Sequence, residues 1–160
     1  MITDQPNLLK LLCDTRFAEG LPNEYLQSLC RTSRMVRIKE GEQLFCEGTV
    51  EDEIFVLTSG HIRLSMSVPG RGDVPFLTVG PGELVGWSGL ISDGRMTAKA
   101  TAAEESVLIA LSGRRIRELC DAQPELGYVL MKRVAQVLSK RLLSTRLQLL
   151  DLFARSGNAS

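Results

Sequence analysis

Regularly spaced glycines between residues 35 and 111 constrain the fold of this chain more than any other feature. Short stretches of β-branched and aliphatic residues lie between them, and His61–Met66 alternates polar and apolar side chains. The compact apolar runs EIFVL and SVLIAL are typical of buried strands. Strands that recur about every 8–12 residues predict an antiparallel sandwich or barrel. The glycines are Gly41, Gly48, Gly60, Gly70, Gly72, Gly80, Gly82 and Gly94.

Helical segments flank this β-rich region on both sides. Leucines at three- and four-residue spacing predict N-terminal helices, with Asn23 as the cap of the second one. After the strands, Ser112 is placed to cap a short helix, and Pro124 lies in the first turn of a long one. The expected bounds are a single domain at 1–155, with N-terminal helices at 7–34, strands at 35–111 and C-terminal helices at 112–155, followed by a tail at 156–160.

The long C-terminal helix carries the alternating three- and four-residue apolar spacing of a coiled coil. A helix of about 30 residues is about 45 Å long, so its end should extend beyond a domain of this size. We expect it to form a parallel homodimer, because an exposed apolar end needs another surface to cover it. The alternative is a helix that folds back on its own domain. The expected dimerisation residues are Met131, Ala135, Leu138, Leu142, Thr145, Leu149 and Leu152.

Two further sets of apolar residues lie on the same helix. One set occupies the first half and is placed to pack on the β-rich region. The other makes the far end apolar on nearly every side. The first set is Leu126, Leu130, Val134 and Val137, and the second is Leu143, Leu147, Leu150 and Phe153.

Charge and local motifs argue against several classes of partner and location. Lysine plus arginine (19) balances aspartate plus glutamate (19), so no overall field attracts nucleic acid or an anionic membrane. The N-terminus lacks the basic and apolar regions of a signal peptide, and the longest strongly apolar run, Val107–Leu111, is too short to span a bilayer. We therefore expect a cytoplasmic protein that does not associate with membranes.

The residues that carry catalysis or bind metals are sparse. Four cysteines lie far apart without a CxxC pair, and His61 is the single histidine, so neither a metal site nor a cofactor is expected. P-loop, GxSxG and HExxH motifs are absent, so we do not expect an enzyme. The charged groups at 51–53 and at 114–117 are interpreted as solvated surface.

The segment GEQLFCEGTVEDEIFVLTSGHIRL, residues 41–64, resembles the first signature of the cyclic-nucleotide-binding domain family. That family includes bacterial catabolite activators, kinase regulatory subunits and gated channels. The order of the expected elements is similar too, and the resemblance covers about residues 8–155. It implies a mainly β fold, a double-stranded β-helix (jelly roll) with N-terminal helices and a long C-terminal dimerisation helix. The matching residues are Gly41, Leu44, Phe45, Gly48, Ile54, Phe55, Val56, Leu57, Ser59, Gly60, Ile62 and Leu64.

The family's binding cassette reads approximately GELALL-x3-PR-x-A. Its glutamate accepts the ribose 2′-hydroxyl, and its arginine holds the cyclic phosphate together with the N–H groups of a short helix. A gap-free match puts Trp87 at the glutamate and Met96 at the arginine, whereas a one-residue shift would restore Arg95 as the phosphate arginine. The candidate ligand-binding residues are Gly86, Trp87, Ser88, Gly89, Leu90, Arg95, Met96, Thr97 and Ala98.

These departures change what the cassette is expected to bind. Loss of the arginine leaves a buried phosphate without its main countercharge, which typically costs about 2–5 kcal/mol. Ordinary binding of cyclic AMP or cyclic GMP is therefore not expected, although backbone donors and the hydroxyls of Ser88 and Thr97 suit a small anion. Trp87 either fills the pocket as a core residue or stacks on a ligand. Arg95 is either a solvated loop residue or a substitute for the missing arginine.

Three functions follow from this resemblance. The first is a non-catalytic sensor or regulatory module for a cyclic nucleotide held in an atypical way, or for another small molecule, with a possible protein partner. The second is a ligand-independent dimeric interaction module in which Trp87 plugs the pocket. The third is a truncated transcription regulator. Bacterial activators of the family carry a DNA-binding domain after the long helix, and only residues 156–160 follow here, so this chain alone is not expected to bind DNA.

Overall fold

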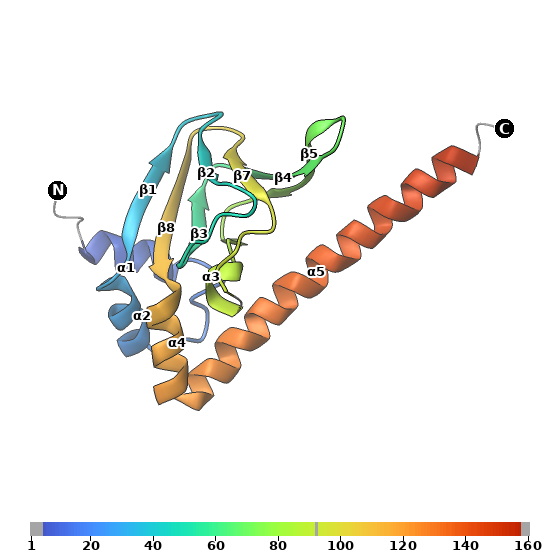
Figure 1. Cartoon of the computed structure of the whole chain (residues 1–160). Helices are drawn as coiled ribbons and strands as arrows, with labels where there is room; N and C mark the ends of the chain where they lie inside the picture. The colour runs from blue at the N-terminus through green and yellow to red at the C-terminus, as the bar shows by residue number, and fades with distance from the viewer. Residues whose placement is uncertain (1–4, 92, 158–160) are drawn as a thin grey trace.

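Two four-stranded antiparallel sheets form the centre of the molecule in the computed structural model, which describes residues 5–91 and 93–157 (Figure 1). The strands are β1 (Arg34–Ile38), β2 (Gln43–Phe45), β3 (Glu53–Ser59), β4 (Ile62–Val68), β5 (Gly72–Val79), β6 (Leu84–Val85), β7 (Lys99–Ala102) and β8 (Ser106–Ser112). One sheet has the order β1-β8-β3-β6 and the other β2-β7-β4-β5. The expected fold class, a mainly β jelly roll with flanking helices, is confirmed.

The helices gather at one end of this β-roll, as Figure 1 shows. They are α1 (Gln5–Cys13), α2 (Asn23–Cys30), α3 (Ser88–Ile91), α4 (Gly113–Ala122) and α5 (Pro124–Gly157). Pro22, and not Asn23, occupies the N-cap position of α2, and no side chain caps that end. The prediction for Asn23 was wrong because the fixed φ of Pro22 already sets the entry to the helix, which leaves Asn23 as its first residue. The Ser112 cap is confirmed, since its hydroxyl accepts a hydrogen bond of 3.2 Å from the Arg115 N–H.

The core consists of two apolar clusters. A helix-side cluster joins α1, α2, α4 and the first half of α5 to one face of the β1-β8-β3-β6 sheet. A roll-interior cluster fills the space between the two sheets, with side chains such as Phe55, Leu57 and Leu108 fully or almost fully buried. Alternation along β3 and β8 explains this division, because successive side chains point to opposite faces of a strand.

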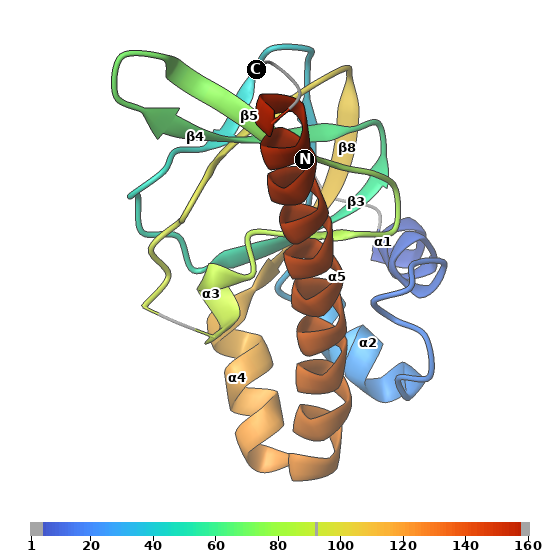
Figure 2. The same cartoon turned by 90° about the vertical axis from the view of Figure 1, so that its right-hand side faces the viewer.

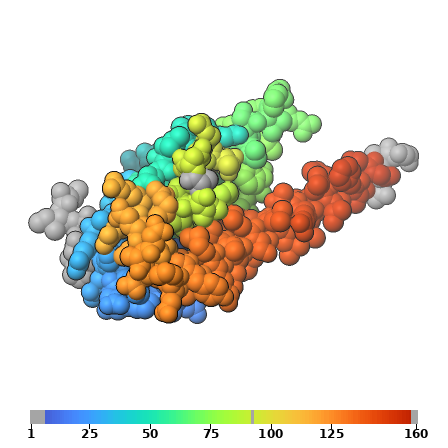
Figure 3. Space-filling view, turned by 60° about the horizontal axis from the view of Figure 1, so that its bottom comes forward, coloured from blue at the N-terminus to red at the C-terminus, as the bar shows by residue number. Residues whose placement is uncertain are grey.

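Helix α5 has 34 residues, so it is about 50 Å long. Its first half is fixed to the body through Leu126, Leu130 and Val134, all buried as expected. Figures 1 and 3 show that its far half extends away from the body. In the described residues, no helix combines the length and the apolar character needed to cross a membrane.

The far half of α5 presents a polar side to its own roll. Arg141 donates a hydrogen bond to the Leu84 carbonyl, and Gln148 Nε2 donates one of 3.2 Å to the Phe76 carbonyl. In Figure 2, this part of the helix lies in front of the roll, beside β5. The apolar side chains at this end remain exposed, so they are not buried by folding back on the roll. They are Leu142, Leu143, Leu147, Leu149, Leu150, Leu152 and Phe153.

Candidate ligand-binding cassette

The cassette begins where β6 turns into α3 at Gly86. The backbone there has a φ of 77°, which a residue with a side chain rarely adopts. A Cβ at this position would also lie 3.3 Å from Phe45 Cε1 and 3.4 Å from Phe55 Cδ2. Glycine is therefore required both by the turn and by the close approach of two aromatic rings.

Helix α3 lies directly on the backbone of the segment that connects β2 to β3. A Cβ added to Gly89 would be 2.9 Å from the Glu53 carbonyl oxygen and 3.1 Å from that of Glu51. Ser88, Gly89 and Leu90 are all buried. The short helix is thus held at one position against the roll by contacts that a larger side chain would prevent.

Residues 94–96 form an extended segment that pairs with residues 48–51. The Met96 N–H donates a hydrogen bond to the Thr49 carbonyl oxygen, and the Gly48 N–H donates one to the Met96 carbonyl oxygen. The donor–acceptor distance is 2.8 Å in both. Because side chains alternate in an extended chain, Met96 and Arg95 point in opposite directions. Met96 is 2% exposed and belongs to the roll-interior cluster.

Arg95 points out of the roll. Its side chain is 62% exposed, and it donates a hydrogen bond of 3.0 Å to the Gly48 carbonyl oxygen beside Asp93. This geometry agrees with the gap-free match, in which Met96 takes the place of the family's arginine. Thr97 is also exposed, whereas Ala98 is buried in the roll interior.

The roll interior beside the cassette carries no charge. The buried residues of the roll-interior cluster are all apolar. Among all the described residues, no Asp, Glu, Lys or Arg is buried. The rings of Phe45 and Phe55 stack with centroids 6.2 Å apart, next to Gly86. A phosphate placed here would lose its hydration without gaining a countercharge. Sequence reasoning matched Phe45 and Phe55 to the family signature but missed that they fill this space.

Trp87 lies on the other side of the sheet from that interior. It is half-buried and packs against the helix-side cluster, which includes Leu90 and Leu130. The space next to Gly86 is instead occupied by Phe45 and Phe55. Within the candidate set, the structure therefore groups Met96 and Ala98 inside the roll, Trp87 and Leu90 with the helices, and Arg95 and Thr97 at the surface.

A charged connection joins α3 to α4. Arg117 on α4 donates to the Gly89 carbonyl oxygen and also forms an ion pair of 2.9 Å with Asp52 Oδ1. The Gly113 N–H donates a hydrogen bond of 2.7 Å to the Asp52 carbonyl oxygen. Sequence analysis interpreted Asp52 and Arg117 as solvated charges, because 65 residues separate them and no local pattern shows that they meet.

The comparisons with known proteins agree with this architecture. Residues 35–123 match the family model described as the cyclic nucleotide-binding domain. A CRP-like cAMP-activated global transcriptional regulator from Mycobacterium tuberculosis is 22% identical over 143 residues, which is 89% of this chain and 62% of that protein. The chain thus spans less than two thirds of that relative.

Two solved structures are similar over most of the chain. The N-terminal domain of a transcriptional regulator from Streptomyces coelicolor is 30% identical, with a TM-score of 0.66, and the match covers 81% of this chain and 91% of that one. A cyclic nucleotide-binding domain from Methylobacillus flagellatus has the same fold at 21% identity, with a TM-score of 0.75 and coverage of 92% and 83%. The family match over residues 35–123, together with these structures, shows that the chain belongs to the cyclic nucleotide-binding domain family.

Proposed function

We propose that this domain is a non-catalytic regulatory module that responds to a small molecule at the cassette and acts through a dimer of α5. The observation that carries the proposal is the continuous connection from α3 through α4 to α5. Arg117 joins the α3 backbone to α4, and α4 packs against the first turns of α5, where Gly127 lies close to Cys120. A ligand that displaces α3 therefore changes the position of α5.

The cassette favours a ligand other than an ordinary cyclic nucleotide. Met96 is buried where the family has its arginine, and Arg95 is engaged at the surface with Gly48. The apolar interior suits an uncharged or apolar group, while the backbone donors around Gly86 and α3 suit a single polar group. Transcriptional regulation and other activities of the longer relatives are assigned to this chain only as a proposal.

A second copy of the chain is the proposed partner of α5. The seven expected dimerisation residues are called the seam below. Six of them are exposed, and Leu138 is half-buried against the helix-side cluster. The exposed ones are Met131, Ala135, Leu142, Thr145, Leu149 and Leu152. The seam therefore faces outward over about six turns of helix. The alternating spacing favours a parallel pair of helices.

Titration with cyclic AMP and cyclic GMP tests the proposed ligand class. We expect these nucleotides to bind about 30- to 5,000-fold more weakly than to a family member that has the arginine, because loss of the countercharge costs about 2–5 kcal/mol. Arg95→Ala should leave the isothermal titration unchanged, since this side chain points away from the roll. The double variant Trp87→Glu/Met96→Arg, which restores the family pattern, is the matched comparison. Affinity tighter than about 10 μM that Arg95→Ala abolishes would contradict the proposal.

Hydrogen–deuterium exchange tests the connection between the cassette and α5. In Arg117→Gln, amides of α3 and of the first half of α5 should exchange about five-fold faster, which corresponds to about 1 kcal/mol. Amides of the β4–β5 hairpin should be unaffected. Arg114→Gln is the control, because Arg114 lies on the same helix and its side chain pairs, among the described residues, only with the exposed Glu118. Unchanged protection of α3 in Arg117→Gln would argue against this route.

A ligand-independent dimeric module is the second candidate. Phe45, Phe55 and Met96 occupy the roll interior beside the cassette, which favours a domain that needs no ligand there. A thermal-shift screen of small molecules separates the two functions. A ligand at 100 times its dissociation constant adds about 2.7 kcal/mol of stability. A hit that an Ala98→Leu variant abolishes supports the sensor, and a screen without cassette-dependent hits supports the second candidate.

A further inference from the structure

A cavity of about 770 Å³ lies outside the cassette, between α5, the connection from α1 to α2 and the turn from β5 to β6. None of the residues that line it belongs to the segment 86–98. Its volume is in the range of small-molecule sites in proteins. The cavity is therefore large enough for a ligand of its own.

Positive charge dominates the wall of this cavity. Four cationic side chains line it, against the two carboxylates of Glu19 and Glu83. Across the part of the chain that the structure describes, none of the four forms an ion pair within 4.0 Å. The cationic residues are Arg16, Arg133, Lys140 and Arg141.

Two of these guanidinium groups are partly removed from water, each with a carboxylate nearby but with no ion pair within 4.0 Å among the described residues. Arg133 donates to the Phe17 carbonyl oxygen and Arg141 to the Leu84 carbonyl oxygen. Desolvation lowers the pKa of both arginines, although Glu19 and Glu83 respectively oppose this shift. A guanidinium has five N–H donors in a planar arrangement, so each group has further donors for a carboxylate or phosphate.

The floor of the cavity is apolar. Phe17, Leu84 and Val134 line it and are themselves buried, and Val137 is half-buried beside them. Apolar walls with a few convergent charged groups bind ligands that combine an apolar body with a charged head. The cavity therefore favours an organic anion over a free inorganic ion.

Part of this cavity lies on the side of α5 opposite the seam, and part lies beside the seam, because Val134 and Arg141 each precede a seam residue by one position. Arg133, Val137 and Lys140 each follow a seam residue by two positions. Two positions correspond to about 200° around an α-helix. A second copy bound along the seam therefore leaves Arg133 and Lys140 uncovered, while Arg141 lies next to the interface.

We infer that this cavity binds an organic anion with an apolar body and a carboxylate or phosphate head group. The ligand bridges α5 to the β5–β6 turn, through Arg133, Lys140 and Arg141 on the helix. The turn leads directly through β6 into Gly86. Binding here therefore fixes α5 relative to the cassette from beside the proposed dimer interface. The inference does not depend on whether the cassette itself has a ligand.

The experiment measures the affinity of 1-naphthyl phosphate by fluorescence titration. This probe carries an apolar ring system and an anionic head. We expect it to bind at least about ten-fold more tightly than 1-naphthol, which shares the apolar body, and more tightly than inorganic phosphate. Raising the salt concentration from 0.05 to 0.5 M should weaken binding, since the contacts are ionic.

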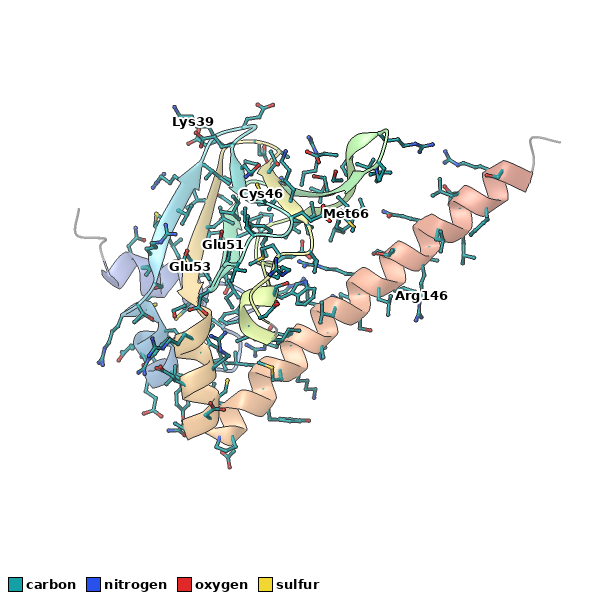
Figure 4. All side chains as sticks on the ribbon, in the orientation of Figure 1. Lys39, Cys46, Glu51, Glu53, Met66 and Arg146 are labelled. Atoms are coloured by element: carbon teal, nitrogen blue, oxygen red, sulfur yellow. The ribbon has the colours of Figure 1, made fainter. Side chains whose placement is uncertain are left out.

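Charge variants at the rim locate the site without disturbing the core. Lys140→Gln should weaken binding of the probe about three- to ten-fold, and Glu19→Gln should strengthen it by a similar factor. Both side chains belong to exposed residues. Arg146→Gln is the control on the same helix; Arg146 points away from the roll in Figure 4. Ala98→Leu, whose side chain lies inside the roll, controls for binding at the cassette and should have no effect.

Two results would overturn the inference. One is equal affinity for 1-naphthol and 1-naphthyl phosphate, which would mean that only apolar surface binds. The other is an unchanged affinity in both Lys140→Gln and Glu19→Gln, which would place the probe elsewhere. A loss of binding in Ala98→Leu alone would instead assign the probe to the cassette, so this outcome is distinguishable from failure of the proposed regulatory function.

Discussion

The double variant Leu142→Glu/Leu149→Glu is expected to sediment as a monomer at tens of micromolar, where the unmodified chain sediments as a dimer. These two side chains are 52% and 53% exposed in the single chain and lie on the proposed seam. Burial of each leucine contributes about 1.5–3 kcal/mol, and a symmetric dimer buries four of them. Their replacement by four carboxylates should raise the dissociation constant at least about 1,000-fold.

The control for this experiment is Leu143→Gln/Leu150→Gln. These leucines are 56% and 64% exposed and lie beside the seam rather than on it. A two-stranded coil leaves that flank uncovered, so this variant should remain a dimer and be more soluble. A glutamate variant that still sediments as a dimer would contradict the seam. Dissociation of both variants would mean that the interface is wider than two helices.

Gly113→Ala is expected to cause the largest loss of stability among single substitutions at the contact between α3 and α4. A Cβ at this position would lie 2.2 Å from the Gly89 carbonyl oxygen and 2.8 Å from that of Asp52. Both atoms are backbone, so relief requires α3 and α4 to separate. We expect a loss of about 3 kcal/mol, which lowers the unfolding temperature by roughly 6–12 °C.

Gly48→Ala is the comparison for that prediction. Gly48 has a φ of 84°, but beyond its two chain neighbours no atom of the described residues lies within 4 Å of an added Cβ. Its substitution therefore introduces backbone strain alone, about 1–2 kcal/mol. Thermal unfolding of the two variants under the same conditions separates close packing from strain. A Gly113→Ala variant no less stable than Gly48→Ala would show that α3 and α4 adjust without cost.

The features that were predictable from sequence are those with a local physical cause. Glycines between short apolar runs fixed the positions of the turns, and the alternating spacing of α5 separated its buried stripe from its exposed seam. The opposite directions of Arg95 and Met96 followed from the geometry of an extended chain. Each of these depends on residues close together in the sequence.

The remaining features depend on contacts between distant segments. Asp52 meets Arg117 across 65 residues, and the cavity beside α5 combines segments around Arg16, Glu83 and Arg133. The sequence also did not predict on which side of the sheet the Trp87 side chain packs, because a residue in a turn lacks the alternation that orients side chains along a strand. The N-cap of α2 was assigned to the wrong residue, since the fixed φ of Pro22 decides where that helix begins.

Because α5 is long, a small tilt at its base moves its far end by a larger distance. Its last 20 residues or so form a lever about 30 Å long, which begins near Val134 and contacts the roll again through the hydrogen bonds of Arg141 and Gln148. A tilt of about 5° at the base moves the tip by about 2.6 Å. Such a displacement is more than half of the roughly 4 Å separation between apolar side chains in contact. Under the proposed function, a small rearrangement at α3 would thereby be amplified into a change at the end of α5 that a second copy of the chain could detect.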